Sequence, residues 1–169
     1  MMRRGIVRRA AALAVMATMG GTVHACGFHG QSPDLAVAHP RSLDVAFALA
    51  DAYRDGRLVP LPALAGPLGY MRATRHLRDF GVALESAGPK RAGASVAVLL
   101  VESGLWTRYR FGDQGAWLVD PHVAGPGAGE AVIVTAEPVL AALGERRITL
   151  DEARSRGLFV EVDPSPVHS

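Results

Sequence analysis

Cys26 and the two histidines that follow it are the residues whose types and spacing could do chemistry. Cys26 and His29 lie three positions apart in a glycine-bounded segment, and His39 follows ten positions later. Thiolate and imidazole are good ligands for copper and zinc, and the amino group of Cys26 could add a third ligand if this residue were the first of the mature chain. The pattern therefore allows a copper or zinc site. A c-type haem would need a second cysteine, which the sequence lacks.

The residues before Cys26 have the pattern of an export signal. Four arginines lie within positions 3–9, an apolar run occupies positions 10–19, and the small residues Val23 and Ala25 precede Cys26. The apolar run is about half of the roughly 20 residues that a permanent membrane-spanning helix needs. We therefore expect a signal peptide over residues 1–25, which is removed on export and leaves Cys26 as the first residue of a bacterial periplasmic protein.

Cleavage before Cys26 leads to one of two products. An ordinary signal peptidase would leave a free thiol, whereas the lipoprotein peptidase would act after Cys26 had received a diacylglycerol anchor. Positions 23–26 resemble a lipobox at their first, third and fourth places, while His24 stands where a small residue is usual. Lipidation would consume the thiol and so exclude metal binding through sulfur. The export route stays open, because Arg3-Arg4 also fits the core of a twin-arginine signal.

Length and composition limit the function classes of the remaining chain. The 169 residues are 49% hydrophobic and 20% charged, which is typical of one compact globular domain. The formal net charge of +2 depends on the leader, because residues 26–169 hold 14 of the basic and all 16 of the acidic residues. A net charge of about −2 gives no support to a nucleic-acid partner. The sequence contains no Walker loop, nucleophile elbow or dinucleotide fingerprint, so we expect binding without catalysis.

The spacing of apolar residues predicts one α+β domain over residues 42–163, between an extended arm at 26–41 and a flexible tail at 164–169. Two helices open this domain. We expect Ser42 to cap the first helix, which should be largely buried, and the second helix to begin near Leu68. The predicted buried stripe of the second helix is Tyr70, Ala73, Leu77, Phe80 and Leu84.

A mainly antiparallel sheet is predicted to follow the two helices. Apolar runs and alternating patterns indicate its strands at residues 95–101, 105–111, 116–123, 131–134 and 158–162. Thr135 is expected to cap a helix over 136–143. Thr149 and Glu152 have the spacing of a capping box for a second, shorter helix. The C-terminal part of the domain should therefore be a strand, two helices and a closing strand.

This C-terminal unit resembles that of a known family. The residues that carry the likeness are Ala131 to Val134, Val139 to Leu143, Ile148, Ala153, Gly157 and Phe159. In this order they resemble the C-terminal half of the sterol-carrier-protein-2 fold, and the preceding strands are compatible with it, so that the likeness covers about residues 95–162. Arg146-Arg147 departs from the family pattern, because members commonly have glycine followed by a basic residue at this turn.

The resemblance implies an apolar cavity between the sheet and the helices, in which that family holds lipids or other hydrophobic ligands. The candidate lining in this chain is Leu99, Val101, Leu105, Tyr109, Phe111, Leu140 and Leu143. The alternative is that these side chains pack against one another as a closed core, since native interiors contain few voids.

Other polar residues are expected to be structural. Arg108 and Arg110 flank Trp106 on one strand face, which we interpret as a solvated face in preference to an anion site. His76 and His122 are interpreted as hydrogen-bonded histidines at the edge of the core.

Three functional hypotheses remain. The first is an exported bacterial binding protein for an apolar small molecule, such as a lipid, or for a partner protein, without a cofactor. The second is a periplasmic copper- or zinc-handling protein that uses Cys26, His29 and His39. The third is an accessory subunit with no small ligand. In each hypothesis, membrane contact is expected only through a lipid anchor at Cys26.

Overall fold

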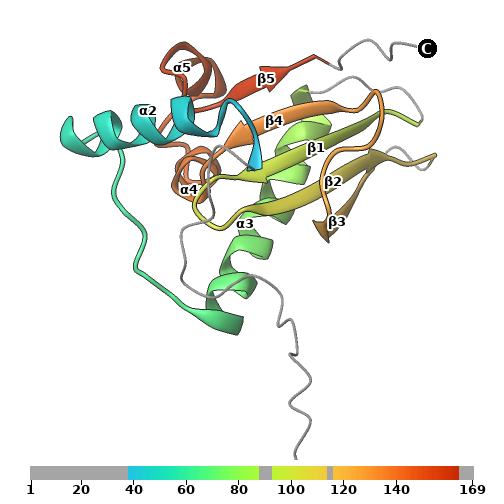
Figure 1. The fold of residues 1–169 in the computed structure, drawn as a ribbon, viewed down its shortest axis with the longest axis horizontal. Helices are drawn as coiled ribbons and strands as arrows, with labels where there is room; N and C mark the ends of the chain where they lie inside the picture. Colours follow the sequence, from blue (N-terminus) through green and yellow to red (C-terminus); the bar gives the residue numbers. More distant parts are fainter. Residues whose placement is uncertain (1–37, 88–92, 114–115, 164–169) are drawn as a thin grey trace, which may run out of the picture.

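The computed structural model describes residues 38–87, 93–113 and 116–163 (Figure 1). The predicted signal peptide, most of the predicted arm with Cys26 and His29, and the predicted tail lie outside these residues. The helices are α2 (Ser42–Arg54), α3 (Gly66–Ala87), α4 (Glu137–Gly144) and α5 (Leu150–Ser155). The strands are β1 (Ser95–Leu100), β2 (Leu105–Phe111), β3 (Trp117–Val123), β4 (Ala131–Thr135) and β5 (Val160–Val162). The predicted α+β class is confirmed.

The five strands form one sheet in the order β3-β2-β1-β4-β5. The predicted antiparallel meander is confirmed for β1, β2 and β3. β4 does not continue the meander beside β3. It crosses the sheet and pairs with β1 in parallel, and β5 then pairs with β4 antiparallel. The crossover brings the end of β1 and the start of α4 to the same end of the sheet.

Helix α3 lies behind the sheet in Figure 1, and contacts of Leu77 and Phe80 with Tyr109 show that its predicted apolar stripe faces β2. Ala73, Leu77, Phe80 and Leu84 are buried, while Tyr70 is half-buried. The Tyr109 hydroxyl of β2 donates a hydrogen bond of 2.7 Å to the Leu77 carbonyl. The Phe80 ring contacts the Tyr109 ring edge-on, with centroids 5.9 Å apart. The stripe of α3 is therefore packed and hydrogen-bonded against β2.

The prediction that the first helix is capped by Ser42 and largely buried is wrong in both parts. Arg41 is the N-cap, and Ser42 is already helical and fully buried, with no hydrogen-bond partner for its hydroxyl in the part of the chain that the structure describes. Only one side of α2 packs on the domain, while Leu43 and Phe47 on its other side are exposed. A helix at the surface buries a stripe and leaves the rest in water, however apolar its sequence is.

The prediction that Thr135 caps the next helix is also wrong. The N-cap of α4 is Ala136, which has no side-chain acceptor. Thr135 is the last residue of β4, and its hydroxyl donates a hydrogen bond to the Leu158 carbonyl instead. The free N–H groups at the start of α4 therefore need an acceptor from elsewhere in the fold.

The turn between α4 and α5 keeps a tight left-handed geometry although it lacks the glycine of the resembled family. Arg146 has a φ of 56°, and its N–H donates to the Leu143 carbonyl while Arg147 N–H donates to the Ala142 carbonyl. The predicted capping box that follows is confirmed, because Thr149 Oγ1 accepts the Glu152 N–H at 3.1 Å. Arg146 thus occupies a backbone conformation that favours glycine.

Replacing Arg146 with glycine is expected to raise the free energy of unfolding by about 1 kcal/mol, because glycine adopts this conformation without a steric penalty. Urea unfolding of Arg146→Gly measures the effect. Arg147→Gly is the matched control, since Arg147 lies outside the left-handed region, and it should be destabilising or neutral. Loss of stability in Arg146→Gly would contradict the described turn.

Candidate functional site

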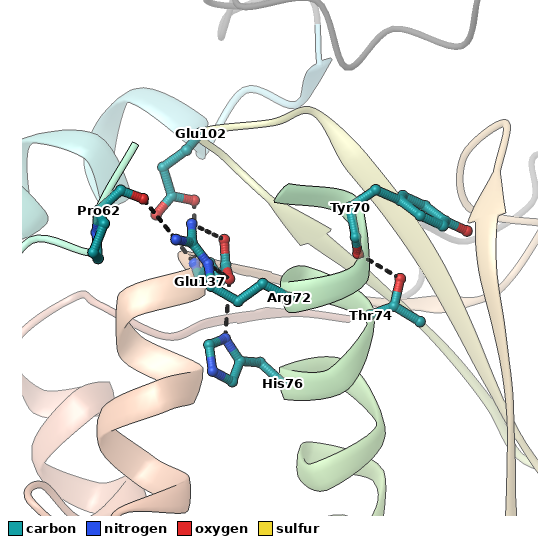
Figure 2. Close-up of polar contacts among 7 residues, drawn as sticks. All are labelled: Pro62, Tyr70, Arg72, Thr74, His76, Glu102 and Glu137. Atoms are coloured by element: carbon teal, nitrogen blue, oxygen red, sulfur yellow. Dashed lines mark hydrogen bonds and ion pairs between the residues drawn. The ribbon is translucent and has the colours of Figure 1, made fainter. Parts of the chain in front are cut away.

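Four ionisable side chains from three separate elements meet where α4 begins (Figure 2). Arg72 and His76 come from one face of α3, one helical turn apart, and Glu137 is the first residue of α4. Glu102 comes from the turn between β1 and β2. We call these four residues the α4 cluster. It joins a helix, a strand end and a second helix that are far apart in the sequence.

Glu137 is the centre of the α4 cluster. Its Oε1 accepts the Arg72 Nε–H at 2.7 Å and lies 3.0 Å from His76 Nδ1, and its Oε2 accepts from Arg72 Nη2 at 3.1 Å. Arg72 Nη1 also donates to the Pro62 carbonyl at 2.6 Å. The side chains of Arg72, His76 and Glu137 are each less than one-fifth exposed. This two-pronged guanidinium contact is the strong form of an ion pair.

Glu102 supplies the acceptor that α4 needs. Both of its carboxylate oxygens accept the backbone N–H of Glu137, at 3.1 and 3.2 Å. A carboxylate at this position satisfies one free N–H and also interacts favourably with the positive end of the helix. The cap of α4 is therefore provided by a residue 35 positions earlier in the chain.

The two carboxyl groups have opposite pKa shifts. Burial opposes ionisation of Glu137, but the hydrogen bonds from His76 and Arg72 outweigh it and lower its pKa. For Glu102, the residue as a whole is exposed but its carboxyl group lies beside Arg72 and Glu137. Desolvation of this group, with a smaller contribution from the negative Glu137, raises the pKa of Glu102 to about 7. Glu137 is thus ionised at neutral pH, whereas the surroundings of Glu102 oppose its ionisation.

The cluster can orient a histidine, but its polar groups are mostly engaged with one another. An ionised Glu137 only accepts hydrogen bonds, so Nδ1 of His76 is the donor in this contact. Within residues 38–87, 93–113 and 116–163, no group of three or more His, Cys, Asp or Glu residues is arranged to hold a metal ion. The observed contacts are those of a clamp between α3, α4 and the β1–β2 turn.

The residues predicted to line an apolar cavity belong mainly to the packed core. Six of the seven are buried, and Leu143 is half-buried. The buried six are Leu99, Val101, Leu105, Tyr109, Phe111 and Leu140. Leu99 is paired with Trp106, whereas Leu105 is paired with Leu100. Because neighbouring residues in a strand point to opposite faces, Leu99 lies on the other side of the sheet from Leu105 and Tyr109. The predicted lining is therefore divided between two faces.

Of the predicted metal ligands, only His39 is described, since Cys26 and His29 lie outside the described residues. The His39 ring contacts Trp106 of β2 edge-on, with centroids 6.3 Å apart. Its Nδ1 accepts the Arg41 backbone N–H at 3.1 Å. Partial burial, together with the positive charge of Arg41, lowers the pKa of His39. The ring is thus mostly neutral at pH 7, and because Nδ1 accepts a hydrogen bond, the ring proton lies on Nε2.

The interpretation of this strand face as solvated agrees with the exposure of Arg110 and is wrong for Arg108. Arg108 Nε donates to both oxygens of Glu130, at 2.9 and 3.1 Å, and Nη2 donates to the Gly125 carbonyl. Glu130 also accepts from the Ser95 hydroxyl and the Gly127 N–H. These contacts hold the β3–β4 crossover on the face of the sheet opposite to α3. Trp106 on the same face is buried.

The two histidines interpreted as structural have different surroundings. His76 is hydrogen-bonded at the edge of the core, as predicted. His122 is exposed, with a φ of 69°, at an irregularity where β3 gains one residue relative to β2. Its ring lies 6.3 Å from the Tyr70 ring. Such a bulge turns a side chain away from its regular direction.

Sequence reasoning missed the α4 cluster. Arg72, Glu102 and Glu137 belong to no recognisable motif in the sequence. The one local signal was the four-residue spacing of Arg72 and His76, which puts two hydrogen-bond donors on the same face of a helix. Their acceptor is 65 positions away from Arg72, and no local pattern connects the two.

A scan against protein-family models finds no match to this chain, and a search of curated proteins finds no significant match. No helix in the described part of the chain is both long enough and apolar enough to span a bilayer.

The two carboxyl groups are expected to affect stability in opposite directions. Glu137→Gln should lower the free energy of unfolding at neutral pH by about 1 to 3 kcal/mol, because it removes a charged acceptor. Since the folded-state pKa of Glu137 is lowered, its contribution is present above about pH 4.5 and is lost as the pH falls through the folded value. Urea unfolding across this range should show the difference from the wild type shrinking towards acid.

Glu102→Gln is the matched comparison for the same measurement. Its folded-state pKa is raised, so Glu102 favours the folded state most below about pH 4.5 and loses that contribution as the pH rises to about 7. The variant should therefore equal the wild type in acid and exceed it in stability above pH 7. If the free energies of unfolding of the two variants, each relative to the wild type, changed with pH in the same way, the described cluster would be contradicted.

Proposed function

We propose that this chain is an exported bacterial protein that acts by binding a partner protein, without catalysis. Two features of the sequence support export: the arginine-rich start followed by an apolar run, and the small residues before Cys26. Binding without catalysis is consistent with the α4 cluster, whose carboxylates accept hydrogen bonds from neighbouring groups of the same fold.

The observation that carries the partner-protein proposal is the placement of the exposed apolar side chains. Eight large apolar residues are 41% to 69% exposed. Seven of them lie on α2, on α3 or on the connection between these helices, and the eighth is Leu118 on β3. The seven are Leu43, Phe47, Val59, Leu64, Leu68, Met71 and Val82. Leu43 and Phe47 lie one helical turn apart on the exposed side of α2, and neighbouring exposed apolar side chains indicate a contact site.

An apolar small molecule is the second candidate ligand, and one observation favours it. The Thr107 hydroxyl is fully buried and has no hydrogen-bond partner in the described part of the chain. Thr107 points to the same face of the sheet as Leu105 and Tyr109, towards α3. Buried hydroxyls are normally satisfied, so a ligand hydroxyl or a buried water would complete this position.

Mass spectrometry of the protein purified from its own cells tests the export step. The intact mass should match that of a chain beginning at Cys26, with or without a diacylglycerol group. A mass that includes residues 1–25 would contradict export.

Native mass spectra of the same protein test what it binds, and they should show a complex with a second protein. Bound lipid without a second protein would instead favour the apolar-ligand candidate, and bound copper or zinc would favour the metal-handling alternative.

Site-specific photocrosslinking tests the contact surface in cells. A benzoylphenylalanine at Phe47, which is 69% exposed on α2, is expected to give one discrete crosslinked product. The same probe at Arg147 is the matched control, because Arg147 is also exposed but lies on the α4–α5 turn. Equal crosslinking at both positions, or none at Phe47, would contradict the partner-protein proposal.

A further inference from the structure

The connection between α2 and α3 is exposed and carries no charge. Residues 58–71 contain no acidic or basic side chain. Val59 and Leu64 in this connection are 64% and 41% exposed. In Figure 1 the chain between the two helices runs along the left edge of the molecule. We call residues 59–65 the proline segment, and its surface is apolar.

The backbone of the proline segment is extended and has few partners. The segment lies between Gly56 and Gly66, which both have a positive φ, and no residue between these two glycines has one. Residues 59–64 form no helix, strand or backbone–backbone hydrogen bond with another described residue. Proline fixes its own φ at about −65° and disfavours the helical conformation in the residue before it. These are the properties of a polyproline II helix, whose backbone groups are left to solvent.

The exposed side chains of the proline segment form two neighbouring ridges. A polyproline II helix has three residues per turn, so residues three positions apart lie on the same ridge. Val59 and Pro62 share one ridge. Pro60 and Ala63 share the next. All four are exposed, whereas Leu61 on the third ridge is half-buried, so two adjacent ridges are open to a partner.

The α4 cluster holds the middle of the proline segment in place. Arg72 Nη1 donates a hydrogen bond of 2.6 Å to the Pro62 carbonyl, while the same guanidinium is bound to Glu137 (Figure 2). The segment is thus attached through one carbonyl, and its side chains stay exposed. A segment that is already restricted in the free protein loses less conformational entropy when it binds.

We propose that the proline segment binds a groove lined with aromatic side chains on a partner protein. This inference rests on the proposed function, because it names the chemistry of that partner. Aromatic-lined grooves accept the preformed ridges of a polyproline II helix. Donors beside the rings, such as the indole N–H of tryptophan, bind the carbonyls that the segment leaves open.

Three other occupants fit the proline segment less well. Unpaired backbone groups are costly in hydrocarbon, so the segment is poorly suited to the acyl region of a membrane. An added β-strand needs backbone N–H donors, and Pro60 and Pro62 remove two of them from the same edge. A second copy of the chain offers no aromatic groove among its described residues, because Phe47 is the one exposed Phe, Tyr or Trp there.

Photocrosslinking of the full chain in an extract of its own cells tests the inference. Benzoylphenylalanine at Val59 should give one discrete product with a second protein. An excess of synthetic decaproline, which adopts the polyproline II conformation, should suppress this product by occupying the same groove. A glycine-serine peptide of equal length is the matched control and should leave the product unchanged, because such a peptide is a flexible coil.

Variants of the prolines test the same contact without a competitor. Pro60→Ala combined with Pro62→Ala should reduce the yield of the Val59 product about tenfold, because the segment regains freedom that binding must restrict again. Pro67→Ala is the matched control, since Pro67 is exposed but belongs to α3, and its yield should equal that of the unsubstituted chain. Urea unfolding shows whether each variant is folded.

Several results would overturn this inference. A product that is insensitive to decaproline, or an equal loss of yield in Pro67→Ala, would exclude recognition of the proline segment. A product of twice the mass of the chain would show a second copy, and a lipid adduct would show a membrane. If Val59 gave no product while Phe47 did, the chain would have a partner that does not bind this segment. The absence of a product at both positions would contradict the proposed function as well.

Discussion

The close approach of α3 to the sheet is the constraint on which the rest of the structure depends. A Cβ at Gly81 would lie 3.2 Å from Cγ2 of Val119 and 3.3 Å from Cε1 of Tyr109, so a larger residue here would force these side chains to shift by a few tenths of an ångström. Tyr109 is fully buried, and burial raises its pKa, so its hydroxyl stays protonated and donates to Leu77. With this face fixed, Arg72 must point towards α4.

The α4 cluster depends on that placement and in turn fixes α4. Glu137 receives hydrogen bonds from α3, while its own N–H is capped by Glu102 from the end of β1. The parallel pairing of β1 and β4 brings Glu102 next to the start of α4, because these two strands end side by side. One ion-pair network therefore joins the helical layer to the sheet.

Local patterns predicted much of the fold and little of the candidate site. The stripe around Leu77 and the capping box at Thr149 could be recognised because their partners lie within a few residues. The capping role assigned to Thr135 was wrong because its hydroxyl found a carbonyl 23 positions away. Glu102 could not be recognised for the same reason: its partner is brought close only by the crossover between β3 and β4, which no local spacing encodes.

The stability of Gly81→Ala tests the central claim most directly. Helix propensity alone predicts that alanine in the middle of α3 stabilises the protein by about 1 kcal/mol. The close packing predicts the opposite, because the Tyr109 ring is held by its hydrogen bond to Leu77 and cannot move aside freely. A lower midpoint of urea unfolding for Gly81→Ala is therefore expected. An increase equal to the propensity gain would contradict the described contact between α3 and the sheet.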